Sequence, residues 1–220
     1  MIRRVYRKLL ARYAQVAYRH RHRTYVMEHV QDRHFVVLPD VFNPVLFRSG
    51  VFLIEQLPHY LQPHHHVLDM GTGSGIGAIF AADIAQYITA LDINPEAVRC
   101  ATINAMLNRV EGRVRVCESD LFAAVQGQQF DVVLFNPPFY TDAPRDDYDH
   151  AWRGENVFAR FANALPHHLK PDGFALLVFS SDGEEAQLMD AFAAANLTVK
   201  VVATRDVINE IMTVYRISNG

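Results

Sequence analysis

From residue 67 onward, short apolar runs of strand length alternate with longer segments that have the 3.6-residue periodicity of helices. Strands that alternate with helices at this spacing predict an α/β fold with a Rossmann-like, doubly wound, mostly parallel sheet of seven strands. The last two strands are separated only by residues 204–210, which is too short for a helical crossover, so they should pair antiparallel. The predicted strands cover residues 67–70, 87–91, 114–117, 132–135, 174–179, 198–203 and 211–217, and the predicted helices cover residues 76–85, 95–108, 156–165 and 184–195. Before them, the pattern predicts a short strand at residues 35–38 and a helix at residues 46–57 that ends at Pro58.

The N-terminal part of the chain has a different character. Residues 1–34 contain nine Lys and Arg residues but only two acidic residues, Glu28 and Asp32. Apolar residues recur at three- and four-residue steps along residues 2–23, which predicts a basic amphipathic helix. We therefore divide the chain into a basic helical extension, residues 1–34, and one larger domain, residues 35–220. The helix could pack on the domain with its basic face exposed, contact RNA or the ribosome, or lie on an acidic membrane surface.

Nothing in the chain predicts a membrane span, a disulfide framework or a metal site. No apolar run approaches the roughly 20 residues that a membrane-spanning helix needs. The two cysteines, Cys100 and Cys117, have neither a disulfide pattern nor a zinc-ligand spacing, which is typical of a reducing compartment. The consecutive histidines at residues 64–66 lack an acidic or thiol partner at ligand spacing. We therefore expect a cytoplasmic protein without a bound metal.

A glycine-rich turn joins the first strand of the regular pattern to its helix. Residues 71–75 read GTGSG, and alternating glycines let the backbone pass close under a ligand. Asp92 stands at the end of the next predicted strand, where a carboxylate can accept hydrogen bonds from both hydroxyls of a ribose. The combination predicts a nucleoside cofactor. Gly73, Gly75 and Ala78 also fit the dinucleotide pattern GxGxxA, so a nicotinamide-dependent oxidoreductase is one alternative.

A further acidic residue follows the third strand of the pattern. Asp120 stands there next to Leu121, so its carboxylate can accept a hydrogen bond from an adenine amino group while Leu121 lies against the base. Asp69, Asp92 and Asp120 then concentrate negative charge at the strand ends. This charge disfavours a pyrophosphate and tolerates a ligand with a sulfonium and an ammonium group. We therefore predict S-adenosylmethionine as the cofactor.

The most specific motif is Asn136-Pro137-Pro138-Phe139, which ends the fourth strand of the pattern. Each proline fixes its own φ and keeps the preceding residue extended, so Asn136 and Pro137 should be rigid. The Asn136 side-chain oxygen and the Pro137 carbonyl can each accept one hydrogen bond from a planar NH2 group, which directs the nitrogen lone pair toward a methyl donor. Phe139 offers a flat face for the substrate. The motif predicts methyl transfer to an amide or an aryl amine, with Asn136, Pro137 and Phe139 as catalytic residues.

From about residue 41 to the C-terminus, the chain resembles the class I S-adenosylmethionine-dependent methyltransferases, and among them the HemK family, which methylates a glutamine side-chain amide. The matching features are the glycine turn, residues 92–97, residues 120–121, residues 134–139 and residues 151–154. The resemblance implies that a protein glutamine is the methyl acceptor and that Asn136 and Pro137 hold its amide. It also implies that Asp69, Gly71, Gly73, Asp92 and Asp120 bind the cofactor. We add Gly75, Ile93, Leu121 and Asn136 to the expected cofactor-binding residues.

Two other functions remain open from the sequence. The NPPF motif is also common in similar ribosomal-RNA amine methyltransferases, so an exocyclic amine of an RNA or DNA base is the alternative acceptor. The basic residues 1–34 fit that alternative because they can contact phosphates. The chain could also bind S-adenosylmethionine without catalysis, as the partner of another protein.

Overall fold

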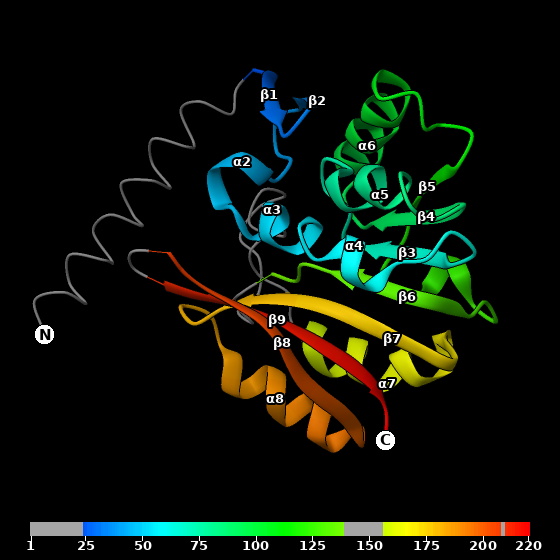
Figure 1. Cartoon of the computed structure of the whole chain (residues 1–220), viewed down its shortest axis with the longest axis vertical. Coiled ribbons are helices and arrows are strands. Elements are labelled where there is room, and N and C mark those ends of the chain that lie inside the picture. The colour runs from blue at the N-terminus through cyan, green and yellow to red at the C-terminus, as the bar shows by residue number, and fades with distance from the viewer. Residues whose placement is uncertain (1–23, 139–155, 208–209) are drawn as a thin grey trace, which may run out of the picture.

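The computed structural model describes residues 24–138, 156–207 and 210–220. Its main feature is a seven-stranded sheet with helices on both faces (Figure 1). A separate two-stranded sheet precedes it in the chain. In chain order, the elements are β1 (Val26–Val30), β2 (Arg33–Val37), α2 (Pro44–Phe47), α3 (Ser49–Ile54), α4 (Leu57–Tyr60), β3 (His66–Met70), α5 (Ile76–Ala81), β4 (Tyr87–Asp92), α6 (Pro95–Leu107), β5 (Val114–Glu118), the 3-10 helix η1 (Ala123–Val125), β6 (Phe130–Phe135), α7 (Val157–His168), β7 (Leu169–Ser180), α8 (Glu185–Ala194), β8 (Leu197–Val207) and β9 (Glu210–Asn219).

The strands of the large sheet lie in the order β5-β4-β3-β6-β7-β9-β8. The strand β3 lies near the centre and pairs in parallel with β4 and β6, while β9 runs antiparallel to both β7 and β8. The predicted doubly wound sheet and the antiparallel pairing of the last two strands are therefore confirmed. The chain moves outward from β3 through β4 to β5 and then returns to β6 on the other side of β3. Ligands of open α/β sheets bind at the carboxyl ends of the strands at such a reversal.

The core consists of two apolar layers, one on each face of the sheet. Val67 and Leu134 pack with Ile79 of α5 in one layer, while Leu68 packs in the layer that contains Phe161 of α7. All five side chains are fully buried. Figure 1 shows α5 and α6 on one face and α7 and α8 on the other. Central strands covered on both faces must be apolar throughout, which explains why their sequences are continuous apolar runs.

The hairpin of β1 and β2 is attached to the large domain by a buried asparagine of α6. Asn104 Oδ1 accepts the Val36 N–H at 2.8 Å, and its Nδ2 donates to the carbonyl oxygens of Val36 at 2.7 Å and Ser74 at 2.8 Å. Residues 26–34, expected in the helical extension, are therefore mostly strand, and the predicted boundary at residue 34 falls inside β2. The reason is the period of two in β2, where alternate side chains are buried against the domain. The helix predicted over residues 2–23 lies outside the described residues.

The single helix predicted for residues 46–57 is instead divided into α2, α3 and α4. Arg48 adopts a left-handed conformation with φ of 55° and ends α2 by donating its N–H to the Pro44 carbonyl. Asn43 caps the start of α2 by accepting hydrogen bonds from two backbone N–H groups of its first turn. Pro58 does not end a helix but lies in the first turn of α4, where a missing N–H has no cost. Apolar periodicity does not report such caps, so the sequence pattern merged three short helices.

Candidate active site

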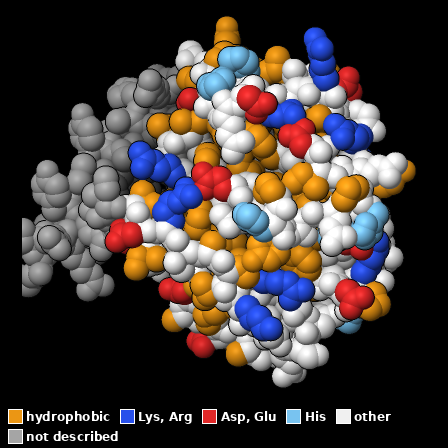
Figure 2. Space-filling view, viewed as in Figure 1, with side chains coloured by type: hydrophobic (Ala, Val, Ile, Leu, Met, Phe, Trp, Pro, Cys, Tyr) orange, Lys and Arg blue, Asp and Glu red, His pale blue; other side chains and the backbone are white. Residues whose placement is uncertain are grey.

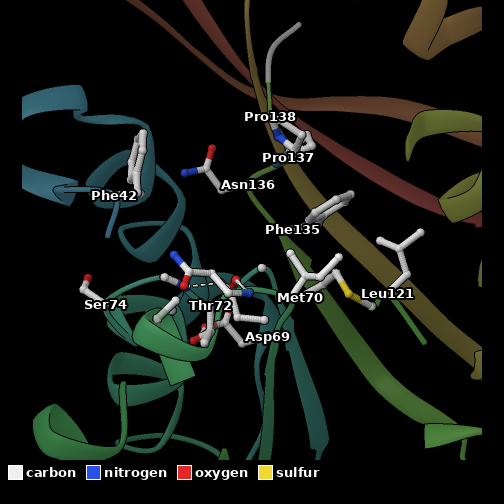
Figure 3. A pocket seen from close by; sticks show the side chains of 18 of the residues that line it. Phe42, Asp69, Met70, Thr72, Ser74, Leu121, Phe135, Asn136, Pro137 and Pro138 are labelled. Carbon is white, nitrogen blue, oxygen red and sulfur yellow. Dashed lines mark hydrogen bonds between the residues drawn. The ribbon is translucent and has the colours of Figure 1, made fainter. Parts of the chain in front are cut away.

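A cavity of about 500 Å³ opens at the carboxyl edge of the large sheet. The glycine turn after β3, the segments that follow β4 and β5, and the residues after β6 form its wall, and parts of the chain before α3 and at the start of α7 complete it. Its volume is in the range of sites for small molecules and cofactors. The cavity brings together Asp69, Asp92, Asp120 and Asn136, which come from four different strand ends. Figure 3 shows Asp69 and Asn136 on facing parts of this wall.

The glycine turn has a backbone that residues with side chains rarely adopt. Gly71, Gly73 and Gly75 have positive φ angles of 63°, 55° and 86°. Gly71 and Gly73, which we expect to contact the cofactor, line the cavity. Gly75 is not among the described residues that line it, and a Cβ there would come within 3.1 Å of Ala101 on α6. Gly75 therefore permits the close packing of α5 on α6, and its contact with the cofactor stays a prediction.

Asp69 is a buried carboxylate that holds the turn in shape. Its Oδ2 accepts hydrogen bonds from the Thr72 hydroxyl at 2.6 Å and from the Ala78 N–H at 2.8 Å. Burial raises the pKa of Asp69 to about 6, although both hydrogen bonds act in the opposite direction. A Cβ on Gly77 would lie 2.5 Å from Asp69 Oδ1, so a glycine is needed where α5 begins above the carboxylate. Asp69 thus braces the turn and places a negative charge in the cavity wall.

Asp92 connects the end of β4 with the glycine turn. Its Oδ2 accepts the Gly73 N–H at 2.8 Å and its Oδ1 accepts the Asn94 N–H at 3.0 Å. Burial raises the pKa of Asp92, and these backbone hydrogen bonds oppose the rise. A carboxylate has about four lone-pair sites, so the two oxygens retain capacity for the hydroxyls of a ribose. Ile93, which is 49% exposed, offers an apolar contact beside them.

Asp120 lies in the loop after β5 and is about half exposed. Its Oδ2 accepts a hydrogen bond from the guanidinium of Arg160 on α7 at 2.6 Å. The Ser119 hydroxyl fixes the loop by donating to the Leu121 carbonyl at 2.7 Å. Leu121 itself has a positive φ of 46° and lines the cavity. The structure therefore places Asp120 and Leu121 at the predicted site and adds an ion pair that the sequence did not indicate.

Asn136 follows β6 with its side chain in the cavity wall (Figure 3). Its Nδ2 donates to Ser49 Oγ at 3.1 Å. Its Oδ1 is buried and accepts no hydrogen bond from any of the described residues. A buried carbonyl without a partner costs roughly 1–3 kcal/mol, so this oxygen is ready to accept an N–H of a ligand. Pro137 and Pro138 continue the wall, and Phe139 lies outside the described residues.

Several polar or aromatic residues at or beside the cavity were not identified from the sequence, among them Phe42, Ser49, Thr72, Ser74 and Arg160. Thr72 and Ser74 stand between the glycines of the turn, and that position is the signal that could have identified them. Phe42 and Ser49 belong to the segment before the large sheet, where no periodic pattern marks a function. Figure 3 shows the Asn136 side chain directed toward the ring of Phe42.

A family model described as Methyltransferase small domain matches residues 32–206. The chain belongs to the methyltransferase small domain family. It is an S-adenosylmethionine-dependent methyltransferase, and the resemblance inferred from the motifs is confirmed. The cavity fits this cofactor, since Asp92 can hold a ribose and several carboxylates can face its positive charge. The family assignment excludes the nicotinamide-dependent alternative, which rested on Gly73, Gly75 and Ala78.

Three curated relatives of this methyltransferase differ in what their names say they modify. A Methanocaldococcus jannaschii protein with the provisional name protein N5-glutamine methyltransferase is 33% identical over 174 residues, which cover 75% of this chain and 85% of the relative. A release factor glutamine methyltransferase of Koribacter versatilis is 34% identical over 163 residues, with 66% of this chain and 57% of the relative covered. Ribosomal RNA small subunit methyltransferase C of Alcanivorax borkumensis is 29% identical, with 73% of this chain and 47% of the relative covered. The chain thus spans about half the length of the last two relatives.

Two solved structures share the fold of this methyltransferase. The E. cuniculi Mtq2–Trm112 complex, described as responsible for methylation of the eRF1 translation termination factor, has a TM-score of 0.62 at 17% identity and covers 82% of this chain and 99% of that chain. The T. thermophilus 16S rRNA N2 G1207 methyltransferase in complex with S-adenosylmethionine and guanosine has a TM-score of 0.62 at 20% identity. The match covers 89% of this chain and 50% of that chain. At these identities, the likeness establishes the fold.

Proposed function

We propose that this methyltransferase transfers a methyl group to the side-chain amide nitrogen of a glutamine in a protein. The observation that supports the proposal most strongly is the buried Asn136 Oδ1, which has no hydrogen-bond donor among the described residues and belongs to the cavity wall. A planar NH2 group would supply the missing donor. Pro137 follows Asn136 directly in the same wall. In the proposal, its carbonyl accepts the second hydrogen bond from this NH2 group.

In the proposed reaction, the nitrogen lone pair forms the new C–N bond while the C–S bond of the methyl donor breaks, and one N–H proton then leaves to water. S-adenosylmethionine supplies the methyl group on a positively charged sulfur. Asn136 and Pro137 hold the two N–H groups of the amide, fix its plane and favour a tetrahedral nitrogen. Because an amide is a weak nucleophile, this positioning provides most of the catalysis. Asp92 holds the ribose, and the charge of Asp69 favours a cationic ligand.

The charge of the cavity favours a protein acceptor over a nucleic acid. Among the described residues that line it, Asp40, Asp69, Asp92 and Asp120 are acidic and Arg160 is the only Lys or Arg. Arg160 already pairs with Asp120, so the formal charge of the cavity wall is negative, which disfavours phosphates. On the face shown in Figure 2, Lys and Arg side chains are scattered between acidic and apolar side chains rather than gathered in one patch. The relatives from M. jannaschii and K. versatilis, both named for glutamine methylation, fit this acceptor.

An exocyclic amine of an RNA base is the second candidate acceptor. Residues 1–23 contain eight Lys and Arg residues and no acidic residue, so this segment could contact RNA or the ribosome. The A. borkumensis relative is named for ribosomal RNA, and the T. thermophilus structure contains guanosine. The Asn136 side-chain oxygen and the Pro137 carbonyl would accept hydrogen bonds from the amine of a base in the same way as from an amide.

We also propose that the protein works in the cytoplasm and that the segment before β1 is an extension of the domain. Cys100 and Cys117 are free thiols, which suits a reducing compartment. None of the helices in the described parts of the chain is long and apolar enough to cross a membrane.

The acceptor can be identified by labelling a cell lysate with the protein and methyl-tritiated S-adenosylmethionine. We expect the label to be sensitive to protease and resistant to RNase, and mass spectrometry of the labelled protein should show a methylated glutamine. Parallel incubation with Asn136→Ala corrects for methyltransferases of the lysate itself. Label that RNase removes would contradict the glutamine proposal and establish the RNA alternative.

A further inference from the structure

The orientation of the Asn136 amide decides which group this residue presents to the cavity. An asparagine side chain has a carbonyl oxygen on one side and an NH2 group on the other, and rotation about its last bond exchanges them. In the structure, Nδ2 lies 3.1 Å from Ser49 Oγ, and Oδ1 is left without a partner among the described residues. In this orientation, the contact with Ser49 uses the NH2 group of the amide and leaves its oxygen available to accept a hydrogen bond from a substrate.

Ser49 is itself fixed in place by the packing around it. It is fully buried at the start of α3 and follows directly after the left-handed Arg48. The adjacent Gly50 lies between two other elements, since a Cβ there would be in van der Waals contact with the side chains of Ile76 at 3.4 Å and Pro44 at 3.6 Å. The segment is thus held between α2 and α5. A hydroxyl on such a segment can restrain a neighbouring side chain without moving itself.

We propose that Ser49 is a positioning residue for methyl transfer, because its hydroxyl holds Asn136 Nδ2 and thereby directs Oδ1 toward the NH2 group of the acceptor. The inference rests on the proposed function, since it concerns the same Asn136. Ser49 is not among the described residues that line the cavity, so it acts through Asn136 rather than on the substrate. The competing explanation is that Ser49 only packs α3 against its neighbours, and the experiments below separate the two.

The first test compares the kinetics of Ser49→Ala with those of the unmodified protein. The acceptor is the macromolecule purified from the lysate fraction that the unmodified protein labels. We expect kcat to fall roughly three- to tenfold, as for the loss of one uncharged hydrogen bond, with an unchanged KM for S-adenosylmethionine. Ser180→Ala is the matched control, because Ser180 is also buried but its hydroxyl bonds to Glu210, so its kcat should not change. An unchanged kcat in Ser49→Ala would overturn the positioning role.

A double-mutant cycle tests whether Ser49 acts through Asn136. If it does, Ser49→Ala causes no further loss of rate in an Asn136→Ala background. Losses that multiply would show an independent structural role and would overturn the proposal. The cycle also distinguishes the two proposals of this site. Full activity of Asn136→Ala would remove the proposed function, whereas a defective Asn136→Ala together with a fully active Ser49→Ala would remove only the role of Ser49.

A spectroscopic measurement tests the same contact without any activity. The side-chain NH2 resonances of Asn136 can be assigned in an NMR spectrum by their absence from Asn136→Ala. In the unmodified protein, the proton that bonds to Ser49 should exchange with water more slowly than in Ser49→Ala. If Ser49→Ala does not fold, Ser49→Cys replaces it, since a thiol is of similar size but a weaker acceptor. Identical Asn136 resonances with and without the hydroxyl would overturn the proposal.

Discussion

The two edges of the large sheet place their carboxylates in opposite environments. At the carboxyl edge, Asp69 and Asp92 are bonded mainly by backbone N–H groups, and burial raises the pKa of both. At the amino edge, Asp131 accepts the backbone N–H of His66 at 2.7 Å and the ammonium of Lys170 at 2.6 Å. Burial would also raise the pKa of Asp131, but these two partners hold it below its ordinary value.

The difference distinguishes a binding site from a structural contact. Asp131 is neutralised by the lysine next to it and therefore needs no ligand. Asp69 and Asp92 have no cation bonded to them within the described part of the chain, and Asn136 Oδ1 nearby also lacks a partner there. Buried polar groups left in this state favour a ligand that supplies positive charge and hydrogen-bond donors. The same sheet thus uses acidic residues for stability at one edge and for binding at the other.

Asn136→Ala should produce the largest change at the carboxyl edge. It removes the acceptor that orients the NH2 group, so the rate of methyl transfer should fall by about a hundredfold or more, as for other preorganised groups at a reacting centre. Binding of S-adenosylhomocysteine, measured by calorimetry, should remain nearly unchanged, because Asp92 and the glycine turn are intact. Methyl transfer at the normal rate would show that the carboxyl edge does not work through this oxygen.

Asp69→Asn tests the raised pKa that separates the two edges. Because the pKa of Asp69 rises from 3.8 to about 6 on folding, the folded state keeps a proton that the unfolded state releases between these values. This group therefore lowers the free energy of unfolding as the pH rises through that window, and has no further effect above it. The shift corresponds to a fall of roughly 3 kcal/mol in the free energy of unfolding across this window, and Asp69→Asn should not show this fall. Chemical denaturation at both ends of the window measures it, and an equal pH dependence in the two proteins would contradict the expectation.

Asp92→Ala and Asp131→Ala form a matched pair from the two edges. Asp92→Ala should weaken S-adenosylmethionine binding by roughly 1.5–3 kcal/mol, the range for hydrogen bonds to a charged group. Asp131→Ala should leave that binding unchanged, because Asp131 bonds to Lys170 at the opposite edge. Isothermal titration calorimetry of both variants measures the contrast. Similar losses in both would mean that the two edges are not functionally distinct.

The smallest effect is expected on the stability of the amino edge. The side chain of Asp131 is 19% exposed and that of Lys170 is 41% exposed, so solvent screens their ion pair. Asp131→Asn should lower the free energy of unfolding by less than about 1 kcal/mol near neutral pH. Because the pKa of Asp131 is lowered on folding, its contribution is present above the ordinary pKa of an aspartate and disappears as the pH falls below it. If urea denaturation shows that Asp131→Asn remains less stable than the unmodified protein in strong acid, the loss of stability does not come from this ion pair.

The sequence predicted the large sheet well and the segment before it poorly. The strands β3, β4 and β6 agree with the predicted runs to within two residues at each end, because central strands covered on both faces must be apolar. In contrast, residues 46–57 form parts of three helices, and residues 26–30 form a strand where a helical extension was expected. These segments depend on local caps and on packing against the domain, which a periodic pattern does not report.

The same division applies to the active site. The acidic residues at the strand ends and the Asn136 motif could be identified from the amino-acid sequence, because a strand end followed by a turn is a local feature and parallel strands bring such ends to one edge. Only the tertiary structure showed that Ser49, 87 positions before Asn136, bonds to its amide, and that Arg160 pairs with Asp120. Contacts of this kind depend on how helices pack around the sheet, and the packing is decided by the whole core rather than by any one segment of the chain.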